Sequence, residues 1–143
     1  MNIKWVCPKC KRVFQKKNQG HSCTIYPVEK HFKNKDYAKK LYNDLKKIIK
    51  NKIGNFKIES LPCCIHFVTT KTNYTFMCVY ALKDGIKIHF TLPTDVKNAR
   101  LPHYARMSNN RYLYELGLQT REEMNPELIK WLKEAYTMKT VTK

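Results

Sequence analysis

Four candidate metal ligands stand within seventeen residues near the N-terminus. Cys7 and Cys10 form a Cys-x2-Cys pair, and after a gap of ten residues His21 and Cys23 form a His-x-Cys pair. Three thiolates and one imidazole complete the tetrahedral shell of zinc, with sulfur about 2.3 Å from the ion. Because side chains fill all four positions, no position is left for a reactive water. The pattern therefore predicts one structural Zn²⁺ that folds a stretch too short to fold by itself.

Two other uses of paired cysteines fit the sequence less well. Disulfide frameworks belong to secreted chains, and residues 1–5 contain no apolar stretch of a secretory signal. A redox pair of the thioredoxin kind needs a βαβ context, which this short basic segment does not offer. We therefore expect a zinc knuckle or short ribbon in a cytoplasmic protein.

Three further cysteines, Cys63, Cys64 and Cys78, lie in apolar runs of the chain. Buried thiols in such runs are ordinary core residues, and we predict that role for them. An alternative is a second metal site made by Cys63, Cys64 and His66. It is the less favoured interpretation, because adjacent cysteines are not the usual spacing of zinc ligands.

Positive charge is the second strong signal. The 143 residues carry 28 lysines and arginines against 11 acidic residues, a formal net charge of +17. The first fifty residues hold half of the basic side chains and only three of the acidic ones. Such an excess repels itself and indicates a polyanionic partner, with nucleic acid the leading class. A lysine-rich proteome is the alternative explanation, and the preference for lysine over arginine argues against specific base recognition.

Length and composition describe one domain with a small module in front of it. With 43% hydrophobic residues the chain can bury a core, and it has no apolar run of about 18 residues that would span a membrane. Pro27 forbids helix continuation and biases Tyr26 toward an extended backbone. We place the boundary there, with a zinc finger at residues 1–26 and an α+β domain at residues 27–143.

Hydrophobic periodicity predicts the elements of this domain. Apolar residues recur at three and four positions from Lys35 to Lys52, which predicts an amphipathic helix, and Gly54 would end it. The period then changes to two, and Asp84-Gly85 signals a hairpin turn. These segments would form an antiparallel meander of four to five strands. The predicted strands are Phe56 to Leu61, Cys64 to Lys71, Tyr74 to Leu82, Ile86 to Leu92 and Arg111 to Leu116.

The alternation from Ile86 to Leu92 gives the sheet an apolar face and a polar face that is available for a ligand. Residues 93–110 are predicted to be irregular. A C-terminal helix would begin at Thr120, as part of a capping box, or at Asn125 with Pro126 in its first turn. We expect the apolar stripe of this helix to pack on one face of the sheet, beside the first helix.

Two stretches carry a resemblance to a known family. The first joins Cys-Pro-x-Cys at residues 7–10 to Asn-Gln-x-His-x-Cys at residues 18–23, and the second runs from Asn125 to Tyr136. Together they resemble the microbial family numbered 5655 among domains of unknown function, over nearly the whole chain. The resemblance implies a compact α+β domain with zinc-ribbon-like ligands at Cys7, Cys10, His21 and Cys23. It implies no activity, although relatives attached to nuclease-type domains favour a nucleic-acid setting.

The sequence shows no catalytic constellation. A nuclease core of the Asp…Glu-x-Lys type is missing, since neither Glu59 nor Glu134 has a lysine two residues later. Four isolated glycines cannot make a phosphate-cradling loop. A nucleophilic pair from the body's cysteines and histidines would require spatial adjacency, which spacing does not establish. We therefore expect a binding protein, with a hydrolase or nuclease as the less favoured class.

The leading hypothesis is a small zinc-containing protein whose basic finger contacts the phosphates of nucleic acid. Trp5, Phe14 and Tyr26 would stack on unpaired bases or form the finger's own core. The alternative is a pocket on the polar sheet face that binds a nucleotide or another small anion, or an accessory protein that sequesters a partner. The candidate anion-binding residues are Lys9, Lys11, Arg12, Lys16 and Lys17 in the finger, and Lys71, Lys87, His89, Arg100, His103, Tyr104 and Arg106 in the α+β domain.

Overall fold

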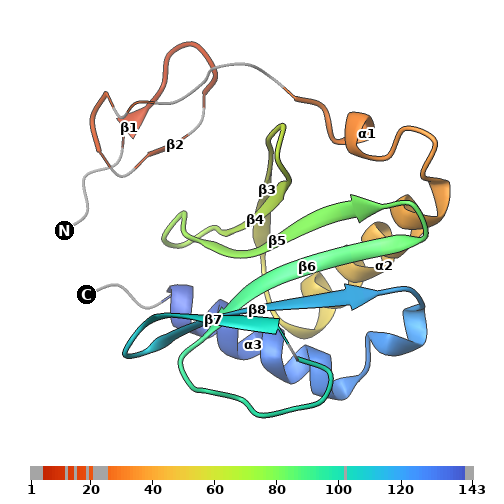
Figure 1. Cartoon of the computed structure of the whole chain (residues 1–143). Helices are drawn as coiled ribbons and strands as arrows, with labels where there is room; N and C mark the ends of the chain where they lie inside the picture. Colours follow the sequence, from red (N-terminus) through yellow and green to blue (C-terminus); the bar gives the residue numbers. More distant parts are fainter. Residues whose placement is uncertain are drawn as a thin grey trace.

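The computed structural model describes residues 5–11, 13–14, 16–18, 20, 26–101 and 103–140, without the side chains of residues 103 and 104. These residues form a small two-stranded hairpin and a larger body in which helices pack on an antiparallel sheet (Figure 1). The predicted α+β class is therefore confirmed. Within the described part of the chain, no helix has both the length and the apolar character needed to cross a bilayer.

The body holds three α-helices, one 3-10 turn and six strands among its described residues. Its helices are α1 (Val28–His31), α2 (Asp36–Lys52) and α3 (Pro126–Thr140), and the 3-10 turn is η1 (Arg121–Glu123). Its strands are β3 (Phe56–Ser60), β4 (Ile65–Thr69), β5 (Thr75–Leu82), β6 (Gly85–Leu92), β7 (His103–Ser108) and β8 (Arg111–Leu118). The hairpin, which precedes the body in the sequence, consists of β1 (Trp5–Val6) and β2 (Val13–Phe14).

The sheet is larger than the four to five strands that the sequence predicts. Its order is β3-β4-β5-β6-β8-β7, with every neighbouring pair antiparallel. The first four strands form the expected meander, but the chain then crosses to the far edge as β7 and returns as β8 beside β6 (Figure 1). Residues 103–108 were predicted to be irregular, and this prediction is wrong because pairing with β8 makes them a strand.

The two long helices cover one face of the sheet. Both α2 and α3 contact β5 and β6, and they also contact each other. In Figure 1 both lie behind the strands. On β6 the residues toward the helices are fully buried, and Lys87, His89 and Thr91 on the opposite face are half-buried, which is the predicted alternation. One face of the sheet is thus the core, and the other presents polar side chains.

The amphipathic pattern of α2 explains its position. Its buried residues recur at three and four positions, so that they form one stripe against the sheet. The helix ends at Lys52. The amides of Ile53 and Gly54 both donate to the carbonyl oxygen of Ile49, which gives this carbonyl of the last turn its hydrogen-bond donors. The buried stripe consists of Ala38, Leu41, Tyr42, Leu45 and Ile49.

The C-terminal helix begins at the second of its two predicted starts, and the first one begins a separate 3-10 turn. Thr120 and Glu123 form a capping box around η1, and the Glu123 carboxylate accepts the backbone N–H of Thr120 at 3.0 Å. Asn125 then precedes α3, and its side-chain oxygen accepts the N–H of Leu128 at 3.0 Å. The short 3-10 turn lets each cap satisfy its own set of backbone donors.

The glycine after Asp84 has a different role from the one that the sequence suggests. The hairpin between β5 and β6 turns through Lys83 and Asp84, and Gly85 is already paired with Leu82 as the first residue of β6. Among the described residues no glycine has a positive φ. A Cβ on Gly85 would lie 2.4 Å from the carbonyl oxygen of Leu118 on the neighbouring strand. The position therefore needs glycine for the close approach of two strands.

Candidate functional site

The described part of the N-terminal segment is an antiparallel hairpin with the first two predicted zinc ligands in its turn. Val6 pairs with Val13, and the amide of Lys11 donates to the carbonyl of Cys7 at 2.8 Å. Cys7 is buried and Cys10 is half-buried. A Cys-x2-Cys turn at the end of a hairpin is typical of a zinc knuckle. His21 and Cys23 lie outside the described residues, so the complete shell remains a prediction.

The basic residues predicted to contact phosphates in this segment are exposed where the structure describes them. Lys9, Lys11, Lys16 and Lys17 all belong to the exposed class. Arg12 lies outside the described residues. Trp5 and Phe14 face each other across the hairpin with ring centroids 6.0 Å apart, which supports their role as the small core of the finger.

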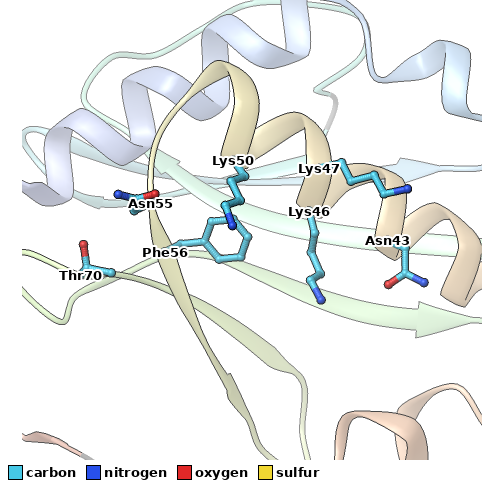
Figure 2. A pocket seen from close by; sticks show the side chains of 7 residues that line it. All are labelled: Asn43, Lys46, Lys47, Lys50, Asn55, Phe56 and Thr70. Atoms are coloured by element: carbon cyan, nitrogen blue, oxygen red, sulfur yellow. The ribbon is translucent and has the colours of Figure 1, made fainter.

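A larger concentration of positive charge lies on α2. This helix carries six lysines and two aspartates, whereas α3 carries three lysines and two glutamates. Along one side of α2, Lys46, Lys47 and Lys50 border a groove of about 830 Å³ (Figure 2). Asn55, Phe56 and Thr70 form its other wall, at the sheet edge made by β3 and β4. We call this feature the lysine groove, lined by Asn43, Lys46, Lys47, Lys50, Asn55, Phe56 and Thr70.

The positive surface continues beyond this groove. A second hollow of about 360 Å³ on α2 shares Asn43 and Lys47 with the lysine groove and adds two lysines and two aspartates, Lys39, Lys40, Asp36 and Asp44. Because the two hollows share residues, lysines follow the helix over about three turns, with Asp36 and Asp44 among them in the second hollow. Lys39, Lys40, Lys47 and Lys50 are exposed, so their ammonium groups can reach a ligand in solution.

Phe56 gives the lysine groove an aromatic wall. Its ring is half-buried and stacks on Phe67 of the core, with ring centroids 5.0 Å apart at 25°. Phe67 is itself fully buried, so Phe56 is held by a rigid support while part of its ring lines the groove. Ammonium groups beside a supported aromatic ring can engage both the phosphate and the base of an unpaired nucleotide.

The polar face of the sheet carries a row of titratable residues that crosses five strands, β3, β4, β5, β6 and β8. The register pairs Glu59 with His66, His66 with Cys78, Cys78 with His89, and His89 with Glu115. Position 103 on β7 continues the row beside Glu115. Residues directly opposite each other on antiparallel strands share a face. The row therefore collects groups that are far apart in the sequence.

His89 lies at the centre of this row. Its Nε2 is buried and lies 3.5 Å from a carboxylate oxygen of Glu115, and its ring packs on Tyr80 with centroids 4.7 Å apart. Burial lowers the pKa of His89 and Lys87 lowers it further, while Glu115 acts in the opposite direction. The imidazole is therefore mainly neutral at pH 7. Glu115 also pairs with Lys87, whose Nζ lies 3.6 Å from the carboxylate and 4.9 Å from the Tyr80 ring centroid.

Three candidate metal ligands converge beside this row. The ligand atoms of Cys63, Cys64 and His66 all lie within 4.8 Å of one another, and the two sulfurs are 3.3 Å apart. Cys64 is buried and Cys63 is exposed. Burial, a hydrogen bond with Cys63 and the nearby Cys78 raise the pKa of the Cys64 thiol to about 12 in the metal-free state. This cluster could hold a metal ion.

The surroundings of the cluster are polar and ordered. The Nδ1 atom of His66 lies 3.2 Å from the hydroxyl oxygen of Thr75, and Cys78 and Tyr80 both form hydrogen bonds with Cys64. Burial is the main reason why the pKa of Tyr80 rises to about 12. The cysteines predicted to be ordinary core residues thus lie on the polar side of the sheet, where they surround a histidine.

The arginines predicted to bind anions have partners within the protein. Arg100 donates from Nη1 to Asn125 and Glu127, both at 3.0 Å, and from Nη2 to the carbonyl of Glu123 at 2.8 Å. Its guanidinium also lies over the ring of Trp131, 5.6 Å from the centroid. It joins the β6–β7 connection to the start of α3, and these contacts favour a structural role over the predicted anion binding.

The remaining predicted residues whose side chains the structure describes do not form a single pocket. Lys87 and His89 lie on the polar face, whereas Arg106 pairs with Tyr112 on the helix-facing side of β7 and donates to Asn109 at 2.9 Å. Lys71 is exposed in the turn between β4 and β5. For His103 and Tyr104 only the register on β7 is described.

The lysines of α2 were not among the anion-binding residues predicted from the sequence, so the lysine groove was missed. The signal was present, since α2 carries a larger excess of lysine than α3. The contribution of Phe56 was not visible, because it depends on how the β3–β4 edge lies beside the helix.

Comparison with known proteins gives one match. The family model described as Domain of unknown function (DUF5655) matches residues 28–139. The matched segment begins at α1 and ends in α3, so it contains the lysine groove and the cysteine cluster, while the hairpin with Cys7 and Cys10 precedes it. No curated protein and no solved structure matches the chain.

Proposed function

The chain belongs to the DUF5655 family, and on that premise we propose that it is a zinc-containing, non-catalytic binding protein for nucleic acid. The observation that carries the proposal is the lysine groove, where Lys46, Lys47 and Lys50 lie beside the supported ring of Phe56. In this proposal the lysines contact phosphates and the aromatic ring stacks on an unpaired base.

The distribution of charge supports a polyanion as the ligand. The chain has a formal net charge of +17, and its lysines concentrate on α2 and on the hairpin in front of the body. Electrostatic contacts of this kind raise association rates and give affinity that is independent of sequence. The ammonium group of lysine is a point charge on a flexible side chain, and it cannot make the paired hydrogen bonds by which arginine recognises a base. We therefore expect the protein to discriminate little between bases.

The zinc ion of the proposal is the structural ion predicted at Cys7, Cys10, His21 and Cys23. Its function would be to fold the hairpin, so that Lys9, Lys11, Lys16 and Lys17 form a second patch that contacts phosphates. The position of Cys7 and Cys10 in one turn supports this part of the proposal.

The test is a fluorescence-anisotropy titration of the full chain with labelled single-stranded DNA, single-stranded RNA and duplex DNA at 50 mM and 200 mM salt. We expect binding that weakens steeply with salt and is stronger for single strands than for duplex. Six phosphate contacts would lower duplex affinity roughly a thousandfold over this range. No binding of any nucleic acid at 50 mM salt would contradict the proposal.

A further inference from the structure

We propose that Cys63, Cys64 and His66 bind one thiophilic d10 metal ion, with Zn²⁺ the physiological candidate, on the polar face of the sheet. This site is separate from the one predicted in the N-terminal hairpin. The inference does not depend on nucleic-acid binding, because it rests on the side-chain cluster alone.

The local fold explains how adjacent cysteines can face the same ion. In a regular strand Cys63 and Cys64 would point to opposite faces. The chain instead turns between β3 and β4, where the amide of Leu61 donates to the carbonyl of Cys64 at 3.0 Å, and β4 begins only at Ile65. This turn brings both sulfurs to one side of the sheet edge, 3.3 Å apart.

The distances fit a tetrahedral ion after small side-chain movements. Two sulfurs bound at about 2.3 Å to one tetrahedral ion lie about 3.8 Å apart. The sulfurs of Cys63 and Cys64 are somewhat closer than this, and all pairs of ligand atoms in the cluster lie within 4.8 Å. Because Cys63 is exposed, rotation of its side chain can adjust the distance between the two sulfurs.

The histidine has the support that metal ligands commonly have. A ligating imidazole usually hydrogen-bonds through its other ring nitrogen, which fixes the tautomer and the ring orientation. His66 has this contact, between Nδ1 and the hydroxyl oxygen of Thr75 at 3.2 Å. In the proposed site His66 binds the ion through Nε2, and Thr75 is a positioning residue.

The donor set selects the class of metal. Two thiolates and one imidazole favour zinc and other soft d10 ions over magnesium or calcium, which prefer oxygen ligands. Three protein ligands leave one position of a tetrahedral ion unfilled, and Cys63, one of the three, is exposed. We therefore expect an exchangeable ion in place of a closed structural one.

The experiment measures metal stoichiometry in the full chain under reducing conditions. The Cys7→Ser/Cys10→Ser double variant removes the predicted hairpin site and serves as the background. After chelation, Zn²⁺ is titrated against a competing chromophoric chelator, and Co²⁺ is titrated by its absorption spectrum. We expect one ion per chain in this background, with sulfur-to-cobalt charge-transfer bands.

Three further variants in the same background assign the ligands. Cys63→Ser/Cys64→Ser should abolish tight binding, and Thr75→Val should weaken it about 10- to 100-fold without loss of the fold. Glu115→Gln is the control, because it removes a charge on the same face at a residue that pairs with His89 and lies outside the three-ligand group. It should retain the ion and the cobalt bands.

Circular dichroism and a thermal melt confirm that each variant is folded. If the hairpin substitutions unfold the chain, Cys63→Ser/Cys64→Ser in the wild-type background provides the second measurement, and it should bind one ion fewer than the wild type. Metal retained after loss of both cysteines would overturn the proposal, as would a folded background variant that binds none. A metal-free protein 2 Da lighter than expected, with Cys63 joined to Cys64, would also overturn it.

Discussion

The hydroxyl of Thr72 donates a 2.6 Å hydrogen bond to the backbone carbonyl of Lys139, and so ties the turn between β4 and β5 to the last turn of α3. Thr72 is buried, and its hydroxyl also lies 2.6 Å from that of the buried Thr69. The end of a helix leaves carbonyl groups that need donors, and this contact supplies one from a distant part of the sequence. The hydrogen bond therefore holds the C-terminal end of α3 against the sheet.

Thr72→Val should lower the free energy of unfolding by about 1–3 kcal/mol. The substitution preserves shape but leaves a buried hydroxyl and a helix carbonyl without their partner. Urea denaturation followed by circular dichroism measures the effect. Thr70→Val is the control, since Thr70 is exposed in the same turn and should change stability by less than about 0.5 kcal/mol. Equal effects of the two substitutions would contradict the role given to Thr72.

Gly85→Ala and Gly117→Ala should have very different effects on the free energy of unfolding, although the two glycines lie in the neighbouring strands β6 and β8. A Cβ at position 85 would lie 2.4 Å from a backbone oxygen of Leu118, whereas nothing lies within 4 Å of a Cβ at position 117. We expect Gly85→Ala to destabilise by about 1–3 kcal/mol through overpacking. Gly117→Ala should be neutral or slightly stabilising, because alanine loses less backbone entropy. Thermal and urea unfolding of the pair provide the comparison, and a harmless Gly85→Ala would refute the close approach.

Arg100→Ala should affect stability and leave nucleic-acid binding nearly unchanged. Its guanidinium bonds to Glu127, Asn125 and a backbone carbonyl at the start of α3, so removal should cost about 1–2 kcal/mol after allowance for partial exposure. Arg106→Ala is the matched control, because the side chain of Arg106 hydrogen-bonds only to residues two or three positions away in the sequence, and these hydrogen bonds are exposed. If Arg100→Ala abolished nucleic-acid binding in a folded protein, the structural role assigned to it would be wrong.

The metal-free protein should lose stability as the pH falls from about 7.5 to 5.5. Burial lowers the pKa values of His31 and His89 in the folded state, while the unfolded values remain near 6.5. The unfolded state therefore binds more protons in this range, and the stability present above pH 6.5 is lost as the pH falls through the folded pKa values. His89→Asn and His31→Asn should each reduce the slope of urea midpoint against pH, measured with a chelator present. An unchanged slope in the double variant would contradict this account.

The regular elements were predictable because their signals are local. The apolar stripe of α2 and the alternation along β6 each fix a face within one segment, and the structure places both as expected. Strand β7 gave no such signal, since residues 105–108 are exposed, including Met107 at 62%. This segment becomes a strand only through pairing with β8, a non-local cause.

The candidate sites were predictable only in part, for the same reason. Spacing predicted Cys7 and Cys10 as zinc ligands, and they share one turn. The cluster of Cys63, Cys64 and His66 was only the less favoured alternative, because adjacent cysteines are not the usual spacing of zinc ligands. The row from Glu59 to Glu115 could not be found from spacing, because its members meet through the register of five strands. The lysine groove likewise needs the β3–β4 edge beside α2.

The central claim is that the lysine groove binds nucleic acid, and the most direct test compares two triple variants of equal charge. Lys46→Ala/Lys47→Ala/Lys50→Ala removes the groove's ammonium groups, and Lys97→Ala/Lys130→Ala/Lys133→Ala removes three exposed lysines elsewhere. The measurement is the slope of log affinity against log salt for a single-stranded oligonucleotide. The groove variant should reduce the steepness by about 2, from three phosphate contacts at roughly 0.7 each, and the control should keep nearly the full slope. Equal slopes in the two variants would show that net charge alone holds the ligand, and would contradict a site on α2.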